Sequence, residues 1–280
     1  MISLTKHHGL GNDFLIAIEP EISLTADDAV HWCNRHLGVG ADGLIVATKA
    51  PGDTEADWSM VLYNADGSRA EISGNGIRCL GQALADHAGL GATTMRIATD
   101  AGLRQLEIQP AEGDTRQVRV DMGAAKPGPG DFDRWDSTGV SPIRQASVDM
   151  GNPHLVALVD DPAAVDLAAV RPVVEASYRA ASTCISLKLI GPTICRSMYG
   201  NEGRESPMPV ARALVPPRLL LPTGDWRMER SPFKCLEVEA VVEVTDTVHL
   251  TGPATYHIAS LSVFPWLRQT RLGSRTRRQP

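Results

Sequence analysis

The segment Asn64–Cys79, N-A-D-G-S-R-A-E-I-S-G-N-G-I-R-C, constrains the fold more than any other part of this chain. Its Asp66-Gly67 pair predicts a tight turn that follows a strand. After a short polar stretch, apolar residues recur at the spacing of one helix face, at Ile77, Leu80 and Leu84. We therefore expect a strand, a turn and a helix, with the helix beginning near Asn75 or Gly76.

The start of this expected helix is rich in small residues. Its first turn reads S-G-N-G from Ser73 to Gly76, so little side-chain bulk covers the free backbone N–H groups. Such a helix end binds a carboxylate or a phosphate, and Asn64 and Asn75 would add polar side chains to the same site. The alternative is a capped helix after a hairpin turn, which this pattern alone does not exclude.

Three more segments combine glycine with asparagine or aspartate beside an apolar run. They are H-G-L-G-N-D-F-L (His8–Leu15), G-V-G-A-D-G-L-I-V (Gly38–Val46) and V-D-M-G-N-P-H-L-V (Val148–Val156). Taken singly, each is ordinary turn chemistry, because Gly, Asn, Asp and Pro are the residues that turns require.

Composition argues against several classes of partner. The 280 residues are 43% apolar and carry a net charge of −6, which argues against nucleic acid as the main partner. We interpret the basic cluster Arg268–Arg278 as a solvated tail. No export signal opens the chain and no apolar run is long enough to cross a membrane, so we expect a cytoplasmic protein. Its five cysteines predict free thiols, not a disulfide framework or a zinc site: Cys33, Cys79, Cys184, Cys195 and Cys235.

Hydrophobic patterning predicts a mixed α/β chain in two similar halves, joined by a loop at Ala124–Asp131. In the first half, strands are expected at Phe14–Ile18, Leu44–Thr48, Trp58–Tyr63, Met95–Thr99, Leu103–Gln109 and Val118–Met122, with helices at Asp27–Asn34, capped by Thr25, and Ile77–His87, ending near Gly89. In the second half, strands are expected near Ala146–Met150 and His154–Val159, and a helix near Leu167–Glu175.

Taken together and in this order, the four glycine-rich segments resemble the diaminopimelate epimerases. The resemblance covers Met1 to about Ser177 and resumes at T-D-T-V-H-L-T-G-P-A-T-Y, Thr245–Tyr256. It implies two lobes, each a curved sheet around a central helix. The expected boundaries are residues 1–118 with a C-terminal return near 256–266 for the first lobe, 119–255 for the second, and 267–280 for the tail.

The resemblance also implies an activity. Family members invert one α-carbon of a small-molecule substrate, interconverting L,L- and meso-diaminopimelate without a cofactor, and commonly form homodimers. Inversion needs an acid and a base on opposite faces of the carbon. The family uses two cysteines, each at the start of a central helix, where the helix N-terminus lowers the pKa of a thiol.

Carried over by position, the expected substrate-binding residues are Asn12, Asn64, Gly74, Asn75 and Asn152, with His154 in a supporting role beside the site. For Asn12, Asn64 and Asn152 the alternative is a side chain that closes its own turn. We favour binding, because loop residues commonly carry function.

Two positions in the first lobe depart from the family pattern. Ser73 stands where the first cysteine belongs, and a hydroxyl is far less acidic than a thiol, so Ser73 is expected to donate a proton or hold a water but not to act as a base. Cys79 lies six residues further along, inside the expected helix, as a small buried apolar residue. Gly43 stands where the family commonly has a glutamine that helps to bind the substrate.

A third departure removes the second cysteine. The family motif W-E-R-G-A-G-E-T-x-A-C-G-T-G-A-C is replaced by the proline-containing segment Met198–Pro217. Back-translation of this segment, read two nucleotides later, allows V-W-E-R-G-A-G-E-S-N-A-C-G-T-G-A-C-A-A. Ser182–Ser197 likewise allows N-V-H-L-V-E-A-D-R-A-D-D-L-P-V-D. We hypothesise that about residues 178–240 are out of frame, and expect no ordered domain over 178–235.

Two other interpretations remain open at this point. A proline racemase-like or hydroxyproline-processing isomerase, in which a residue other than cysteine occupies one catalytic position, would suit Ser73. An inactive pseudogene product or a small-molecule binder that keeps the first lobe would suit the missing second motif.

Overall fold

The computed structural model describes residues 2–150, 153–161, 164–179, 186–190, 195–197, 211–213, 231–235, 238–244 and 247–263. The first part of the chain forms β1 (Ile2–Gly9), β2 (Asn12–Ile18), α1 (Ala26–Cys33), β3 (Gly43–Lys49), β4 (Trp58–Asn64), β5 (Arg69–Ala70), α2 (Gly74–His87), β6 (Thr93–Thr99), β7 (Gly102–Ile108) and β8 (Thr115–Asp121). The later part forms β9 (Lys126–Pro127), η1 (Trp135–Thr138), β10 (Arg144–Asp149), β11 (Pro153–Leu158), α3 (Leu167–Arg179), β12 (Ser186–Ile190), β13 (Cys195–Ser197), β14 (Ala211–Ala213), β15 (Ser231–Cys235), β16 (Val238–Val244) and β17 (Val248–Val263).

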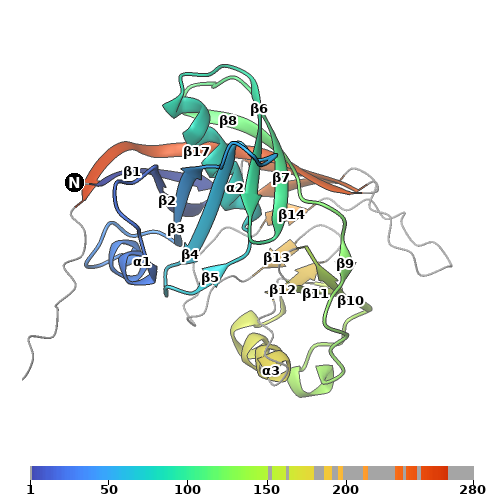
Figure 1. The fold of residues 1–280 in the computed structure, drawn as a ribbon. Coiled ribbons are helices and arrows are strands. Elements are labelled where there is room, and N and C mark those ends of the chain that lie inside the picture. Colours follow the sequence, from blue (N-terminus) through green and yellow to red (C-terminus); the bar gives the residue numbers. More distant parts are fainter. Residues whose placement is uncertain are drawn as a thin grey trace, which may run out of the picture.

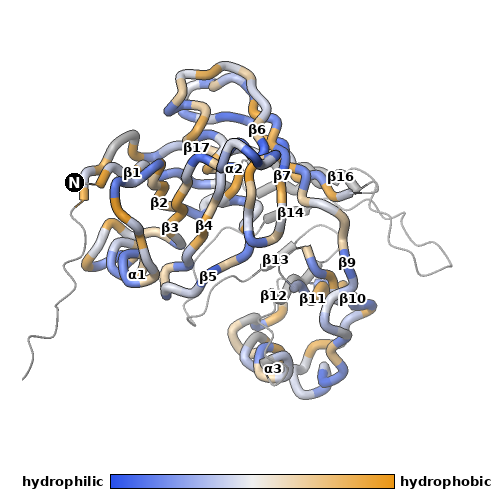
Figure 2. Tube along the Cα trace, in the orientation of Figure 1, coloured by the Kyte–Doolittle hydropathy of each residue, from blue (hydrophilic) through white to orange (hydrophobic). Residues whose placement is uncertain are grey.

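The first lobe is a curved sheet that encloses α2 (Figure 1). Strands β1 and β2 are antiparallel, β2 and β3 are parallel, and β3 and β4 are antiparallel. Apolar residues from β2, β3, β4, β6, β7 and β8 bury the helix, and every residue from Gly76 to Ala85 is buried. Figure 2 shows hydrophobic residues along β2, β3 and β4, next to α2. The predicted fold class, a mixed α/β chain with a curved sheet around a central helix, is confirmed.

A separate core covers the outer side of the same sheet. Trp32 and Cys33 of α1 pack with Leu15 and Leu44. The predicted cap at Thr25 is confirmed, since Asp28 Oδ2 accepts hydrogen bonds from the backbone N–H and the hydroxyl of Thr25, at 2.9 and 2.8 Å.

The second region has its own small core beside β10 and β11. Phe132 and Trp135 meet edge to face, with ring centroids 5.0 Å apart, and pack with Leu155 and with Val174 of α3. Figure 1 shows α3 next to β10–β12, apart from α2. Helix α3 was predicted to end at Glu175 and continues to Arg179.

The last described strand completes the first lobe. One half of β17 pairs with β8, from His249 opposite Asp121 to Thr255 opposite Thr115. The other half pairs with β1, from Thr255 opposite His8 to Val263 opposite Ile2. The division of the chain into residues 1–118 and 119–255 stays a prediction, and its boundary lies within β8.

The two ends of α2 are closed in different ways. At the N-terminus, Ser73 is the cap and its Oγ accepts a hydrogen bond from the Gly76 N–H at 3.1 Å. The helix therefore begins at Gly74, one or two residues before the predicted start. The Ser73 side chain supplies the acceptor that the Gly76 N–H lacks in the first turn of the helix. At the C-terminus, Gly89 has the left-handed φ of 64°, and the Leu90 N–H bonds the Ala85 carbonyl at 2.8 Å, as the predicted end near Gly89 requires.

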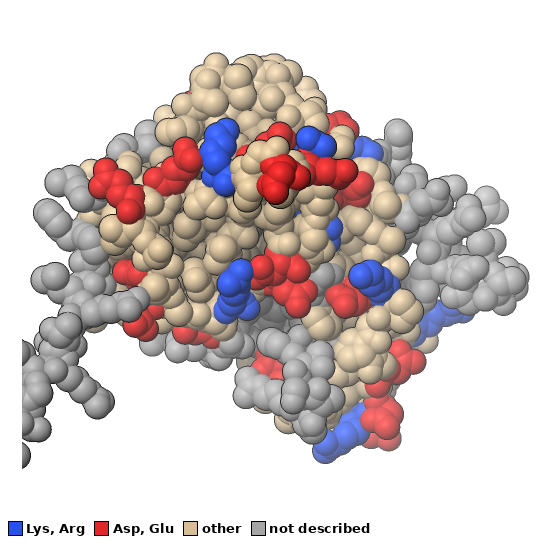
Figure 3. Space-filling model, viewed as in Figure 1, with Lys and Arg blue, Asp and Glu red and all other residues tan. Residues whose placement is uncertain are grey.

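Most of the region predicted to be out of frame lies outside the described residues. Within residues 178–240 only the backbones of β12–β15 and the start of β16 are described, together with the end of α3. Across the described residues, no helix combines the length and apolar character that crossing a membrane requires. Acidic and basic side chains are intermixed on the face shown in Figure 3.

Candidate functional site

Strand register brings the predicted site residues of the first lobe to one edge of the sheet. Phe14 lies opposite Gly43, and Gly43 lies opposite Asn64. Asn12 begins β2 and Asn64 ends β4, so both face the same edge. The start of α2 packs there as well, since a Cβ at Gly76 would lie 3.4 Å from the Phe14 ring. Asn12, Asn64, Ser73, Gly74 and Asn75 are all partly exposed and within reach of a ligand.

Asn12 and Asn75 are joined directly, although they lie 63 residues apart in the chain. The Asn75 side-chain Nδ2 donates to Asn12 Oδ1 at 3.3 Å. Asn12 Nδ2 in turn donates to Asp42 Oδ2 at 2.6 Å. In this structure Asn12 therefore does not close its own turn: it connects the β1–β2 hairpin to the start of the central helix. That hairpin turn is strained, since Leu10 has φ of 56°.

A cluster of charges holds this hairpin against the loop before β3. Arg35 donates to both Asp13 carboxylate oxygens, at 2.6 and 3.1 Å, and to Asp42 Oδ1 at 2.7 Å. Lys6 lies 3.0 Å from Asp13 Oδ2. Burial alone would raise the pKa of Asp13, but the hydrogen bonds from Arg35 and Lys6 outweigh it and the pKa lies below its ordinary value.

Arg78 is the largest fully buried side chain in the described part of the chain, with 0% exposure. Its Nη2 donates to Asn75 Oδ1 at 2.8 Å and its Nη1 donates to the Gly74 carbonyl at 3.0 Å. Its Nε lies 3.5 Å from the Pro253 carbonyl on β17. The guanidinium thus ties the first turn of α2 to the last strand of the lobe.

Ser73 lies at the N-terminus of α2, as predicted, and its hydroxyl oxygen is used as the helix cap. The hydroxyl hydrogen is left for another acceptor. Ser73 and its backbone carbonyl accept from the N–H groups of Gly76 and Ile77, whereas those of Gly74 and Asn75 have no partner inside the helix. The N-terminus of α2 therefore retains two backbone donors.

The side chain of Asn64 closes its own turn, which is the alternative to substrate binding considered for this residue. Its Nδ2 donates to Ser68 Oγ at 2.9 Å, across the Asp66-Gly67 turn. The turn itself is confirmed, because the Gly67 N–H bonds the Asn64 carbonyl at 2.9 Å and Gly67 has φ of 82°. In this structure Asn64 stabilises its own turn, and its role in binding stays a prediction.

Two glycines of the site are positions where backbone comes close to a neighbour. A Cβ at Gly43 would lie 2.7 Å from the Tyr63 carbonyl, and a Cβ at Gly74 would lie 2.7 Å from Leu250 Cδ2. The glutamine that the family commonly carries at position 43 would therefore require the backbone of β3 or β4 to shift.

The remaining predicted residues belong to the β10–β11 hairpin. Gly151 and Asn152 lie outside the described residues. His154 is 7% exposed on β11, opposite Val148. Met150, just before the turn, packs against the core around α2, which brings this hairpin to the first lobe.

The described cysteine side chains lack the environment of a catalytic thiol. Cys33 and Cys79 are free and buried, as predicted. Burial raises the pKa of each thiol to about 12. Cys79 therefore does not replace the cysteine that Ser73 displaces, which agrees with its predicted role as a small buried residue.

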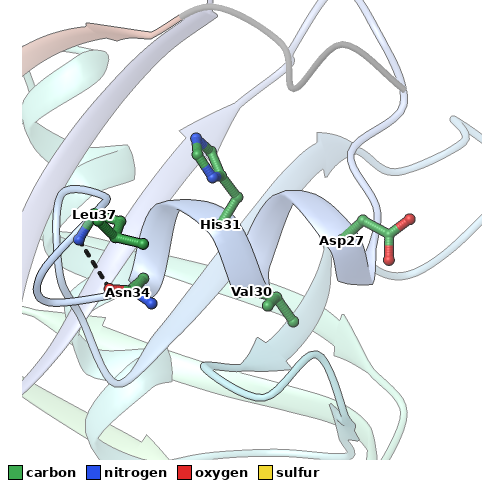
Figure 4. A pocket seen from close by; sticks show the side chains of 5 residues that line it. All are labelled: Asp27, Val30, His31, Asn34 and Leu37. Atoms are coloured by element: carbon green, nitrogen blue, oxygen red, sulfur yellow. Dashed lines mark hydrogen bonds between the residues drawn. The ribbon is translucent and has the colours of Figure 1, made fainter. Parts of the chain in front are cut away.

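A shallow groove of about 290 Å³ runs along α1 and contains none of the predicted site residues. Figure 4 shows its lining side chains, Asp27, Val30, His31, Asn34 and Leu37. Within the described ranges, no group of three or more His, Cys, Asp and Glu side chains is placed to hold a metal ion.

Comparison with known proteins identifies the family. The model of the diaminopimelate epimerase family matches residues 4–127. A diaminopimelate epimerase of Synechocystis is 38% identical over 278 aligned residues, which cover 90% of this chain and 96% of that protein. The chain belongs to the diaminopimelate epimerase family.

Other members of the family match a shorter part of the chain. The diaminopimelate epimerase of Synechococcus elongatus is 42% identical over 189 residues, which cover 62% of this chain and 65% of that protein. The chain thus matches just under two thirds of the length of this relative. The member from Trichodesmium erythraeum is 32% identical over 275 residues, covering 90% of this chain and 96% of its own.

Solved structures share the fold at low sequence identity. A predicted epimerase from Pseudomonas aeruginosa has a TM-score of 0.66 at 12% identity, covering 95% of this chain and all of that one. A hydroxyproline epimerase from Agrobacterium vitis has a TM-score of 0.56 at 14% identity, covering 93% of this chain and 92% of that one. Both likenesses concern the fold alone.

The sequence did not point to Arg78, Asp42 or Arg35 as members of the site. The contacts of Asp42 with Asn12 and of Arg35 with Asp13 join segments that are distant in sequence. Arg78, in contrast, contacts Asn75, which lies three residues before it. One signal was available: Arg78 follows Ile77 at the start of an apolar helix, where a charged residue needs specific partners to be buried.

Proposed function

We propose that this protein derives from an isomerase that interconverts L,L- and meso-diaminopimelate without a cofactor, and that the printed chain holds one half of its catalytic machinery. The observation that carries the proposal is the Asn12–Asn75 hydrogen bond at the N-terminus of α2, in a chain of this family. Both residues are those that the family resemblance assigns to substrate binding.

The chemistry of this edge suits a carboxylate. The backbone N–H groups of Gly74 and Asn75 lie at the positive end of the α2 dipole, where an anion is stabilised. As the α-proton leaves, negative charge moves onto the carboxylate of an amino acid. Donors fixed before the reaction stabilise that charge best, because they need no reorganisation.

Inversion requires a second group on the opposite face of the α-carbon. On the first face we assign proton donation to Ser73, whose hydroxyl hydrogen is free while its oxygen caps the helix. A serine hydroxyl is not acidic enough to serve as the base at neutral pH. The printed chain is therefore expected to have very low activity.

We further propose that the second acid/base was displaced by a change of reading frame. With free choice of codons, the shifted frame of Met198–Pro217 can encode the family motif with its cysteine, although two of the three bases of each codon are already fixed by the printed residues. The match to the Synechococcus elongatus relative supports this, because it covers 62% of the chain, close to the extent of residues 1–177. The gene sequence between the codons for Glu175 and Thr245 tests the frame directly.

Exchange of the α-proton of diaminopimelate for deuterium in D₂O, followed by NMR, tests the function. We compare the printed chain, the frame-repaired chain, and each with Ser73→Cys. Only the frame-repaired Ser73→Cys protein is expected to exchange and interconvert the isomers rapidly. Ser73→Cys alone is expected to remain inactive, because the opposite face still lacks its cysteine.

The same assay separates the alternatives. Exchange with hydroxyproline but not with diaminopimelate would favour the hydroxyproline-processing interpretation. If the repaired Ser73→Cys protein exchanges neither substrate, the enzyme hypothesis is wrong and a binding or pseudogene role replaces it.

Three properties that the family resemblance implies stay predictions: a cytoplasmic location, assembly as a homodimer, and the two-lobe division at residues 118–119. Binding of Asn152 to substrate and support from His154 also remain part of this proposal.

A further inference from the structure

Four side chains form one continuous series of hydrogen bonds at the candidate site. Arg78 Nη2 donates to Asn75 Oδ1 at 2.8 Å, Asn75 Nδ2 donates to Asn12 Oδ1 at 3.3 Å, and Asn12 Nδ2 donates to Asp42 Oδ2 at 2.6 Å. We call this series the amide relay. Each asparagine accepts at its oxygen and donates from its nitrogen.

The two ends of the relay fix its direction. A guanidinium can only donate, so the Asn75 side chain must turn its oxygen toward Arg78. A carboxylate can only accept, so Asn12 must turn its NH₂ toward Asp42. Reversing either amide would oppose donor to donor or acceptor to acceptor.

Both ends of the relay are themselves held in place. Arg78 is fully buried and bonds the Gly74 carbonyl at 3.0 Å. Asp42 accepts from Arg35 at 2.7 Å through Oδ1 and from the Asp13 backbone N–H at 3.1 Å through Oδ2. The orientation of the two amides is therefore imposed by groups that do not belong to the predicted binding set.

This orientation decides what kind of ligand group the site accepts. Each side-chain NH₂ has two hydrogens, and the relay uses one from Asn12 and one from Asn75. Among the described residues, the second hydrogen of each has no hydrogen-bond acceptor. With the backbone N–H groups of Gly74 and Asn75, these hydrogens form a set that contains donors only, which matches a carboxylate.

We propose that Arg78 and Asp42 are positioning residues, which orient Asn12 and Asn75 as N–H donors toward a substrate carboxylate. The inference rests on the proposed function for the identity of that substrate. The charge of Arg78 adds to it, because a cation beside a helix N-terminus strengthens the positive potential that the anion meets.

Two measurements on the full chain test the relay. The first is hydrogen exchange of the Asn12 and Asn75 side-chain NH₂ groups, followed by NMR without ligand. The second is the affinity for meso-diaminopimelate. The variants are Asp42→Asn, whose amide lets Asn12 reverse, and Arg78→Lys, which keeps the charge but loses the forked donor geometry. Arg116→Lys is the matched control, since Arg116 is a buried arginine at the other end of α2.

In both relay variants, we expect NH₂ exchange to accelerate and affinity to fall about tenfold, as the loss of one hydrogen bond to a charged group predicts. Arg116→Lys is expected to change neither. Because Asp42 is partly exposed, Asp42→Asn keeps the test valid if Arg78→Lys fails to fold. The proposal is overturned if Asp42→Asn shows wild-type exchange, or binds diaminopimelate as tightly as wild type. If exchange behaves as expected but the wild type binds no diaminopimelate, the relay stands and the proposed function fails.

Discussion

Helix α2 has a buried arginine at each end, and the partners of the two differ. At the C-terminal end, Arg116 donates to the Asp86 carboxylate at 2.8 Å and to the backbone carbonyls of Leu90, Gly91 and Gln109, at 2.8 to 3.1 Å. At the N-terminal end, Arg78 donates to the side-chain oxygen of Asn75 and to the carbonyls of Gly74 and Pro253.

The helix dipole gives these two arginines opposite energetics. A cation is stabilised near the C-terminus of a helix and destabilised near the N-terminus. Arg116 therefore adds stability where it lies, while Arg78 opposes the dipole. A buried charge in this unfavourable position is consistent with the binding role proposed above, because the same positive potential attracts a carboxylate. Burial alone therefore does not distinguish an arginine that stabilises the fold from one that positions residues of a binding site.

The largest expected effect follows from removing each arginine in turn. Arg116→Met should lower the free energy of unfolding by about 3 kcal/mol, because it leaves one carboxylate and three carbonyls without their donor. Arg78→Met should cost about 1 kcal/mol, because the unfavourable dipole interaction is removed together with the hydrogen bonds. Urea unfolding of both variants measures the difference. Equal losses, or a larger loss for Arg78→Met, would contradict the distinction between the two ends.

The cap at Ser73 gives the next largest effect. Ser73→Ala should destabilise the protein by about 1 kcal/mol, because the Gly76 N–H loses its acceptor. Ser73→Asn is the matched control, since asparagine caps a helix as well as serine does. Thermal unfolding compares the three proteins. If alanine is tolerated as well as asparagine, Ser73 is not required as a cap, and its hydroxyl would be free for substrate.

The smallest expected effect is a pH dependence at the N-terminal end. The pKa of Asp13 is lower in the folded state than in the unfolded state. Its contribution to stability is therefore fully present above the unfolded-state pKa, near 4, and is lost as the pH falls through the folded-state value. Because Arg35 is about half exposed, we expect only about 0.5 kcal/mol.

Asp13→Asn should flatten this part of the stability profile between pH 5 and pH 2. Urea midpoints of the variant and the wild type across that range provide the measurement. An unchanged acid slope in the variant would show that other carboxylates cause the loss.

Local sequence patterns predicted most elements of the first lobe, because each depends on residues that are close in the chain. Apolar strand-like runs predicted β2, β3, β4, β6 and β7 to within two residues at either end. β1 was not predicted as a strand, since its alternation of apolar and polar residues ends at Leu4 and only polar residues follow up to His8. The start of α2 was placed too late because a cap depends on the side-chain rotamer of Ser73, which a pattern does not encode.

The site was only partly predictable for a related reason. Asn12, Asn64, Gly74 and Asn75 came from a family resemblance; strand register places the first two at one edge, and the packing of α2 brings the other two there. Asp42 became visible only through its long-range hydrogen bond to Asn12, whereas Arg78 lies three residues from Asn75 and its contact needed the helix geometry. The two-residue pairings β5 and β9 are too short to leave a periodic signal.

The pairing of β17 with β1 has a consequence for synthesis on the ribosome. β1 cannot pair with β17 until the residues between them have been translated, so the first lobe closes only after Val263 has been added. A shift of frame that was never corrected would delete this closing strand and leave β1 and β8 with open edges, which promote aggregation. Under the proposed change of frame, its recovery before Val248 would be what lets the message still yield a closed first lobe.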